Sequence, residues 1–575
     1  MMRLVFFVIV LSCCVVSVTS QADAALTKGQ LKDIANTLQP ASISEPKMLK
    51  ELAWFHKISQ PFRGKTVHVV SEDIPTHRWE KEVLAKQFTA LTGIKIDYSI
   101  LGEGAVVEAI FRQVSQGTHL YDIYVNDADH IGTHARVQGV VNLTKYMQGK
   151  GKKFTNPDLD LDDFINLKFG QDYDGQQLQL PDQQFANLYW FRHDWFTRPD
   201  IRTQFRAYTA KKYGSQHTYD LGVPVNWAAY EDIAEFFTQT TIDGQQVYGH
   251  MDFGKKSPSL GWRFTDAWLS IAGAGDKGLP NGVPVGEWGI RTVDRIPRGS
   301  TVRRGGATNG PAAVYALQTY IDWLAKYTSP EARLGTFKDN NIASAQGNVA
   351  QQIFLYTLWL SEPAFHKGPM VDEKGLPVWR VAPTPHGRYW SEGMKVGYQD
   401  AGSWTIPKDT QGGRRAASWL WAQFCVSKSA ALAKFIVGGT PVRHSTLKTT
   451  YVQKNKKHWG GLIEFYQSDG VNKWTDTGLN VPHYPLLFRE WWPNLDNAIQ
   501  GKISAQQAMD NIAQAQDKIM QALPKTKYGP RLNNKSTRQY WLNKAGAPKA
   551  QREAEPPKTL PYEEAIKQWR SHDRK

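Results

Sequence analysis

Acidic and amide side chains stand at three places where they could bind a small polar ligand. They are Glu72 and Asp73, then Glu103, then Asn126, Asp127 and Asp129. Carboxylates accept hydrogen bonds and amides both donate and accept them, so these groups suit a ligand that offers hydroxyls. Each group directly follows an apolar run typical of a β-strand. For any single acid, a helix N-cap or an ordinary surface charge is the alternative interpretation.

The sequence contains no motif of a familiar catalytic class. It has no G-x-S-x-G, H-E-x-x-H, P-loop or C-x-x-C pattern, and its histidines lack the spacing of zinc ligands. We therefore expect no metal and no cofactor. A secreted carbohydrate-active hydrolase stays open as an alternative, because its two carboxylates need only converge in space.

The elements that would position these acids alternate along the chain. Residues 66–70, 94–100 and 121–125 have the pattern of strands, and helical patterns lie between them. Such alternation predicts an α/β fold with parallel strands and right-handed crossovers. Ligands bind beyond the carboxyl ends of the strands in open sheets of this kind, where the three acidic groups stand.

Further along the chain the pattern is less regular. Residues 273–311 are rich in glycine and proline and predict a long irregular loop, and residues 525–575 read as a polar, basic tail. Cys425 lies in the apolar helical pattern of residues 419–425, which favours a buried, unreactive thiol.

Length, composition and charge narrow the class of protein. The chain has 575 residues, which predicts more than one lobe, and 12% aromatic residues, which fits a soluble binder of sugars or polyols. Lys and Arg outnumber Asp and Glu by 69 to 54, giving a net charge of +15. Because the basic residues are scattered, we expect no nucleic-acid partner, and a polyanion-binding protein is the weakest of the alternatives.

Residues 1–24 have the pattern of a secretory signal peptide. An apolar run follows Arg3, and residues 22–24 form an A-x-A cleavage pattern. We therefore expect an exported protein in the periplasm, with Cys425 as its one thiol after cleavage. Lipidation at Cys13 is a less favoured alternative.

Short motifs in a fixed order resemble those of one protein family. They occur at residues 88–96, 117–123, 139–144, 225–232, 345–350, 401–406, 439–443 and 503–509. In this order they resemble the extracellular solute-binding proteins of family-1 type, the receptors of carbohydrate ABC importers. Longer strings at residues 71–77, 180–191 and 396–404 resemble the long glycerol-binding subunits of rhizobial-type importers.

The resemblance implies a periplasmic-binding-protein fold of type II, with two α/β lobes joined by crossing hinge strands around a ligand cleft. It implies four parts after the signal peptide, namely an N-terminal helical extension at 25–63, an N-terminal lobe at 64–182 (completed by about 381–436), a C-terminal lobe at 183–380 (completed by about 437–524) and the tail at 525–575. It also implies a monomer without enzymatic activity that captures glycerol, or a related neutral polyol or sugar, and delivers it to the permease subunits in the inner membrane.

Candidate ligand-binding residues follow from their positions in this resemblance. They are Glu72, Asp73, Glu103, Asn126, Asp127 and Asp129 in the first lobe, Gln183, Gln184 and Trp190 at the crossing, and Trp227, Trp262, Arg263, Asp266, Tyr356, Asp400, Ser403 and Trp404 in the second lobe and hinge. Trp404 is the favoured aromatic contact, whereas Trp190 could equally belong to the core. The acids favour a neutral ligand over a phosphorylated one, unless Arg263 points into the cleft.

Overall fold

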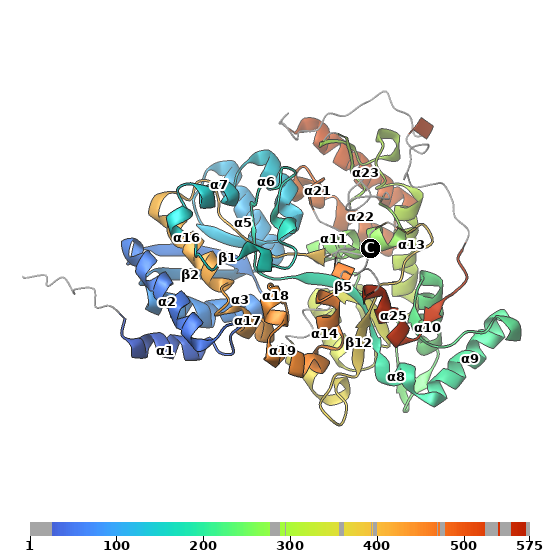
Figure 1. The fold of residues 1–575 in the computed structure, drawn as a ribbon. Coiled ribbons are helices and arrows are strands. Elements are labelled where there is room, and N and C mark those ends of the chain that lie inside the picture. Colours follow the sequence, from blue (N-terminus) through green and yellow to red (C-terminus); the bar gives the residue numbers. More distant parts are fainter. Residues whose placement is uncertain are drawn as a thin grey trace, which may run out of the picture.

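The computed structural model describes residues 26–275, 288–293, 295–355, 362–392, 394, 399–468, 470–471, 478–523, 539–540 and 554–570. The predicted signal peptide and Tyr356 lie outside these residues, as do the side chains of Glu103 and Asp400. No helix in the described part of the chain combines the length and the apolar character needed to cross a membrane. The ribbon forms two lobes that lie side by side (Figure 1).

The first lobe is built on a five-stranded sheet with the order β2-β1-β3-β14-β4. Its strands are β1 (Thr66–Glu72), β2 (Lys95–Leu101), β3 (Ile123–Asn126), β4 (Leu180–Pro181) and β14 (Ser403–Thr405). The first three strands are parallel, which confirms the α/β pattern predicted from the sequence, whereas β14 is antiparallel to both of its neighbours. A strand from a distant part of the chain therefore completes this sheet.

Helices cover both faces of this sheet. They are α1 (Lys28–Thr37), α2 (Glu45–Ser59), α3 (Pro75–Trp79), α4 (Ala85–Thr92), α5 (Glu103–Gln116), α6 (Ile131–Val137), α7 (Leu143–Gln148), α16 (Gly412–Cys425) and α17 (Ala431–Gly438). Helix α4 ends at Gly93, whose φ of +73° suits a residue without a Cβ. Met48, Leu52 and Phe55 of α2 are fully buried in the same core as β1, so the predicted helical extension packs as part of this lobe.

The second lobe surrounds β5 (Phe185–Arg192), a strand in which all eight residues are buried. Strands β11 (Gln351–Leu355), β12 (Trp379–Ala382) and β13 (Gln399–Asp400) pair with it in antiparallel register. Continuous apolar character is what a strand covered on both faces requires. The main helices around it are α8 (His193–Thr197), α9 (Pro199–Tyr213), α10 (Trp227–Thr238), α11 (Pro258–Arg263), α12 (Leu269–Ala272), α13 (Pro311–Lys326), α14 (Phe337–Ala345), α18 (His444–Leu447), α19 (Thr450–Asn455), α20 (Leu462–Tyr466), α21 (Tyr484–Phe488), α22 (Trp491–Ile499) and α23 (Ala505–Ala522).

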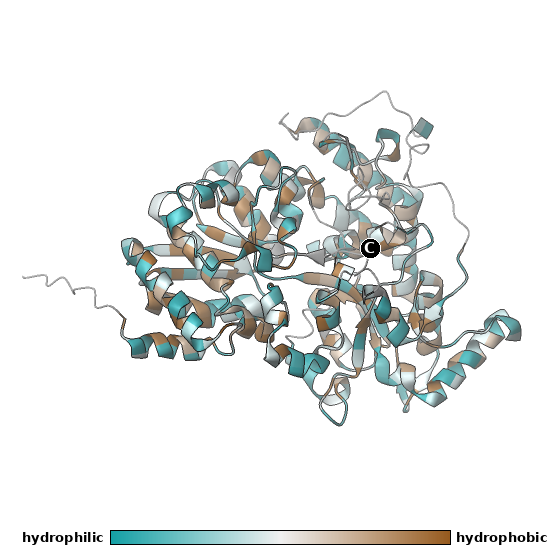
Figure 2. Cartoon of the chain, viewed as in Figure 1, coloured by the Kyte–Doolittle hydropathy of each residue, from teal (hydrophilic) through white to brown (hydrophobic). Residues whose placement is uncertain are grey.

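Each lobe has its own hydrophobic core. The core of the first lobe gathers Trp404, Trp419 and Trp421, and that of the second gathers most of the other buried tryptophans. Cys425 is buried in the first core, as predicted, and burial raises the pKa of its thiol. In Figure 2 brown residues alternate with paler and teal ones along the central strands, whereas teal dominates on the outer helix α9. Two separate cores are what allows two lobes to move as units.

Three segments cross from one lobe to the other. Residues 182–184 join β4 to β5, residues 401–402 join β13 to β14, and residues 439–443 join α17 to α18. The first two crossings are bonded together, because the backbone N–H groups of Asp182 and Gln183 donate to the carbonyl of Gly402 at 2.8 and 3.1 Å. Two lobes joined by crossing segments agree with the predicted fold class, but the second crossing lies at 401–402, after β12 and β13 of the second lobe, and not at about 380–381 as the predicted boundaries had it.

Two predictions about irregular segments need correction. Part of the predicted loop at 273–311 forms a hairpin of β9 (Arg291–Val293) and β10 (Ile296–Gly299). The end of the predicted tail docks on the second lobe, where β15 (Thr559–Leu560) pairs with β6 (Val223–Pro224) and α25 (Tyr562–Arg570) buries Trp569. The apolar spacing of Ala565, Ile566 and Trp569 on one helix face explains the docking of α25.

Candidate functional site

A cleft of about 480 Å³ lies where the two lobes meet. From the first lobe it receives the residues that follow the carboxyl ends of β1, β2 and β3, and from the second it receives α11, the turn after it and the first residues of α14. Its volume falls in the range of small-molecule sites. The cleft therefore stands where the strand pattern predicted a ligand.

Four carboxylates line this cleft. Glu72 and Asp73 follow β1, Asp127 follows β3, and Asp266 enters from the second lobe. Asp266 lies in a π-helical turn, a local widening of the helix that is frequent at functional sites. The arrangement offers hydrogen-bond acceptors from both lobes to one ligand, and it disfavours a ligand that carries negative charge.

Apolar and aromatic side chains form the rest of the wall. Phe185, Trp262 and Phe337 line the cleft, and the rings of Trp262 and Phe337 pack edge to face with centroids 5.4 Å apart. The buried indole N–H of Trp262 has no hydrogen-bond partner among the described residues. A ligand hydroxyl could accept this bond while its carbon skeleton packs against the rings.

A salt bridge spans the opening of the cleft. Lys338 at the start of α14 lies 3.6 Å from Asp73 of the first lobe, which also accepts a 2.7 Å hydrogen bond from Arg78. The bond from Arg78 and the charge of Lys338 lower the pKa of Asp73, so this carboxylate remains ionised. Lys338 thereby connects the two lobes through charge.

Two predicted site residues support the cleft from behind. The amide of Gln183 donates to Glu72 Oε1 at 3.1 Å, and Gln183 itself is fully buried. Asn126 accepts bonds from Gln179 and Thr405 at 3.2 and 3.1 Å, which hold the end of β3 against β14. These amides orient the residues of the cleft without lining it.

Other predicted residues are placed away from the cleft. The tryptophans Trp190, Trp227 and Trp404 are core residues with at most 2% exposure. Trp404, the favoured aromatic contact, instead donates its indole N–H to Asp182 Oδ1 at 2.5 Å. The pattern of an apolar strand did not show which side of the sheet this ring would occupy.

The remaining candidates are also directed inward. Arg263 is fully buried and bonds both oxygens of Asp252 at 2.9 and 2.7 Å, so its charge is neutralised outside the cleft. Gln184 donates to the carbonyl of Ile165 at 2.9 Å, and Ser403 donates to that of Ala401 at 2.8 Å. Asp129 is buried in the turn before α6. With Arg263 paired in this way, the acids determine the charge that the cleft presents.

Sequence reasoning missed several residues of the wall. Phe185, Ser257, Ser259, Phe337 and Lys338 line the cleft but were not among the candidates. Ser257 precedes α11 and Thr336 caps α14, so helix N-terminus signals mark both segments. Those signals locate the helix ends, but nothing in them indicates that both ends face the first lobe.

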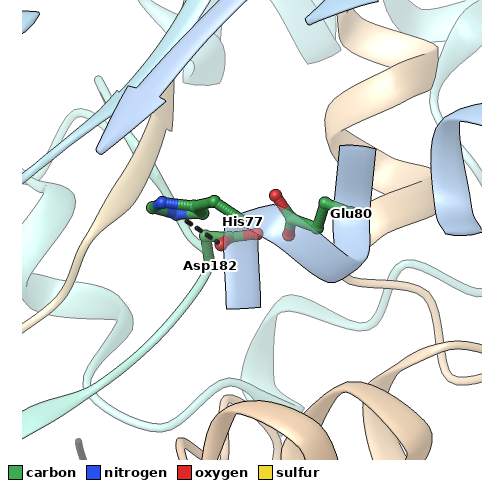
Figure 3. A group of neighbouring side chains, drawn as sticks. All are labelled: His77, Glu80 and Asp182. Atoms are coloured by element: carbon green, nitrogen blue, oxygen red, sulfur yellow. Dashed lines mark ion pairs between the residues drawn. The ribbon is translucent and has the colours of Figure 1, made fainter. Parts of the chain in front are cut away.

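One group of side chains has the composition of a metal site. His77, Glu80 and Asp182 offer ligand atoms within 4.8 Å of one another, and Figure 3 shows them pointing together. However, the ammonium of Lys434 lies among them, 2.6 Å from Glu80 Oε1 and bonded to Asp182. A resident positive charge thus occupies the place that a metal ion would need. We call these four residues the hinge cluster.

The electrostatics of the hinge cluster follow from complete burial. Burial and the charge of Asp182 raise the pKa of Glu80 to about 7, against the attraction of Lys434. Burial acts in the same direction on Asp182, but Lys434 and His77 outweigh it and lower the pKa of that carboxyl. Burial opposes a charged His77, yet Asp182 and the nearby acids raise its pKa. The cluster therefore keeps one carboxylate ionised beside Lys434.

A second contact between the lobes lies at α6. The hydroxyl of Thr133 accepts the N–H of Tyr484 at 2.8 Å, and Arg136 donates to the carbonyl of Leu479 at 2.8 Å. A Cβ added at Gly132 would come 2.1 Å from the carbonyl oxygen of Gly478 and 2.5 Å from that of Val481. We call this contact between residues 478–484 and α6 the clasp. It requires glycine at position 132.

Comparison with known proteins gives the class of fold. No family model matches the sequence, and a search of curated proteins found no match. Among solved structures, the chain resembles an ABC transporter solute-binding protein from Agrobacterium radiobacter K84 in complex with ribitol, at 18% identity and a TM-score of 0.60 over 80% of this chain and 100% of that one. It also resembles one from Agrobacterium vitis S4 with bound D-mannitol, at 16% identity and a TM-score of 0.58 over 80% and 100%.

Maltose-bound MalE3 of T. maritima is similar at 16% identity, with a TM-score of 0.57 over 79% of this chain and 100% of that one. These similarities confirm the predicted periplasmic-binding-protein fold, with two α/β lobes and a cleft between them.

Proposed function

We propose that this chain is the periplasmic substrate-binding subunit of an ABC importer, which captures a neutral polyol or sugar in the interlobe cleft and delivers it to the membrane permease. Glycerol is the ligand that the sequence resemblance favours. The single observation that carries the proposal is the cleft itself, where carboxylates from both lobes and an aromatic wall from the second lobe face one volume of about 480 Å³.

The chemistry of the cleft supports this ligand class. Hydroxyl groups can donate to Glu72, Asp127 and Asp266 and accept from the indole of Trp262, while the carbon skeleton contacts Phe185 and Phe337. Two lobes that close over such a ligand exclude water, which strengthens each hydrogen bond. The similar solved structures hold bound ribitol, D-mannitol or maltose, so they do not favour the hydrolase alternative.

Calorimetric titration tests the proposal. The protein is unfolded and refolded to remove carried-over ligand, then titrated with glycerol, ribitol, D-mannitol, maltose and glycerol 3-phosphate. We expect saturable one-to-one binding of at least one neutral compound and no binding of glycerol 3-phosphate. Preferred binding of the phosphate ester, or no binding of any neutral compound in the panel, would contradict the proposal.

A further inference from the structure

The hinge cluster is a fully buried set of charges directly behind the ligand cleft. Side chains of His77, Glu80, Asp182 and Lys434 are at most 1% exposed. Their remaining bonds are also internal, since Glu80 accepts the hydroxyl of Tyr98 at 2.9 Å. Charges that cannot reach water hold fixed positions, because separating them would leave a charge uncompensated in the core.

The cluster joins the segments that cross between the lobes. Asp182 belongs to the first crossing, and its partner Trp404 lies in β14, directly after the second. Lys434 lies in α17, which leads into the third crossing. His77 and Glu80 come from the helix that follows β1. The first-lobe ends of all three crossings therefore meet at one charged centre.

Glu72 of the cleft is held at both ends by this centre. The ring Nδ1–H of His77 donates to the backbone carbonyl of Glu72 at 2.9 Å, while His77 Nε2 faces Asp182 at 3.8 Å. The side chain of Glu72 accepts from Gln183, the residue after Asp182. A Cβ at Gly402 would come 2.5 Å from the Gln183 amide nitrogen, so the second crossing packs closely against this amide.

We propose that Asp182 and Lys434 are positioning residues of the ligand cleft, which orient Glu72 through His77 and Gln183 without touching the ligand. This inference rests on the proposed function. It makes the affinity for ligand depend on a salt-bridged centre at the hinge. It also predicts that ligand bound at Glu72 perturbs the hydrogen bond between Trp404 and Asp182.

The indole of Trp404 provides a spectroscopic readout of this connection. The full chain is labelled with ¹⁵N-tryptophan, and the variant Trp404→Phe assigns the indole N–H resonance. Ribitol is the ligand, unless another neutral compound of the calorimetric panel binds more tightly than ribitol, in which case that compound is used. We expect the Trp404 resonance to shift at ligand saturation in the unmodified protein.

The variant Gln183→Met removes the bond to the Glu72 carboxylate, one of the two connections between cluster and cleft, without removing a charge. We expect about tenfold weaker binding, the equivalent of one lost hydrogen bond to a charged group. At saturation the Trp404 resonance should shift less than in the unmodified protein, because only the bond from His77 to the Glu72 carbonyl remains. Gln423→Met is the matched control, because Gln423 is also a fully buried amide of the first lobe and bonds the carbonyls of Phe154 and Trp419. It should lower stability but leave affinity and the resonance shift unchanged.

The cluster itself is tested with Lys434. Lys434→Arg keeps the positive charge and should preserve binding, whereas Lys434→Met leaves Asp182 uncompensated and should weaken it. If Lys434→Met does not fold, the proposal is tested by comparing Gln183→Met with Gln423→Met in ligand affinity and in the shift of the Trp404 resonance. Normal ligand binding by Gln183→Met, together with a Trp404 resonance that does not shift at ligand saturation in the unmodified protein, would overturn the positioning role and leave the proposed function intact. Absence of any binding by the unmodified chain would overturn both.

Discussion

At the scale of single residues, hydrogen bonds fix both the backbone and the side chain of Glu72 in the cleft. Its carbonyl is bonded by His77, its carboxylate is bonded by Gln183, and the residue lines the cleft. Replacing it with glutamine keeps the shape and removes the charge. The substitution Glu72→Gln thus separates the effect of charge on ligand affinity from the effect of packing.

We expect Glu72→Gln to weaken binding of a neutral polyol or sugar by about tenfold, because a hydrogen bond to a charged acceptor becomes a neutral one. Calorimetric titration measures the change. The exposed carboxylate Glu563 in α25 does not line the cleft, so Glu563→Gln serves as the control. Equal affinities of the two variants would show that Glu72 does not contact the ligand.

A second prediction at this scale concerns the pH dependence of stability. The pKa of Glu80 is raised to about 7 in the folded protein, from an ordinary value of 4.5. The folded state therefore binds a proton that the unfolded state has released, so this contribution is full below pH 4.5 and is lost as the pH rises through 7. The groups that face Glu80 are His77, Tyr98, Asp182 and Lys434.

We expect the free energy of unfolding, measured by urea titration between pH 4.5 and 8, to fall less with pH in Glu80→Gln than in the unmodified protein. Burial opposes a charged His77, but Asp182 and Glu80 raise its pKa, so loss of the Glu80 charge reduces the His77 contribution as well and flattens the slope further. Glu563→Gln should retain the full slope. Parallel pH profiles for Glu80→Gln and the unmodified protein would contradict the raised pKa.

The residues of the site were predictable to different degrees. Glu72, Asp73 and Asp127 follow from one rule, since parallel strands bring their carboxyl ends to one edge. Trp404 and Arg263 did not follow, because their types fit a cleft and a core equally well. Only their partners determine where these two side chains point, and Asp182 lies 222 residues before Trp404, whereas Asp252 lies 11 residues before Arg263.

At the scale of elements, the clasp at α6 depends on close approach of two backbones. We expect Gly132→Ala to destabilise the protein by about 1–3 kcal/mol and to weaken ligand binding, because its Cβ would collide with carbonyl oxygens of residues 478 and 481. Alanine favours a helix over glycine, so a loss cannot come from α6 alone. Thermal unfolding and calorimetry measure both effects.

Gly29→Ala in α1 is the control for the clasp, because a Cβ there meets only the Thr27 hydroxyl at 3.7 Å. This change should be neutral or slightly stabilising. Unchanged stability and affinity in Gly132→Ala would show that residues 478–484 can shift to accommodate the added Cβ at no cost in free energy.

Helix α25 gives the other prediction at this scale. Trp569 is 2% exposed and packs edge to face on Phe465 of the second lobe, with ring centroids 5.5 Å apart. Trp569→Ala should lower the free energy of unfolding by about 3–5 kcal/mol, measured by urea titration. Tyr451→Ala removes a ring that is 43% exposed and should change it by less than about 0.5 kcal/mol. Similar values for both variants would mean that α25 does not contribute to the lobe.

The elements were predictable where their pattern is local. Strands β1, β2 and β3 and the helix ending at Gly93 follow from apolar spacing within short windows. The antiparallel place of β14, the hairpin of β9 and β10 and the pairing of β15 with β6 did not follow. These short strands become stable only through partners that the neighbouring sequence does not reveal.

At the scale of the whole molecule, exposed salt bridges connect the lobes around the cleft and the clasp. They are Lys338 with Asp73, Arg489 with Glu108, and Arg295 with Asp174. Each exposed pair contributes about 0–1 kcal/mol and is screened by salt. We expect the affinity for a neutral ligand to fall roughly two- to fivefold between low salt and about 1 M NaCl, measured by calorimetry.

Lys338→Met should reduce this salt dependence, because it removes the pair at the cleft opening. Lys255, which is exposed and does not line the cleft, provides the control variant Lys255→Met. Since the ligand carries no charge, its own contacts respond weakly to salt. An affinity that is independent of salt in all three proteins would show that these pairs do not favour the closed arrangement.

The docking of the C-terminal segment has a consequence for synthesis. Strand β6 at residues 223–224 pairs with residues 559–560, and the core around β5 includes side chains of α25. Both partners are synthesised long after β6 and β5. A nascent chain that has emerged from the ribosome as far as α23 still lacks this partner, so the second lobe completes its core only after residues 559–570 have been synthesised. Contacts so distant in sequence slow folding and prolong the exposure of apolar surface. Chains that terminate early should therefore be prone to aggregation and to degradation by proteases.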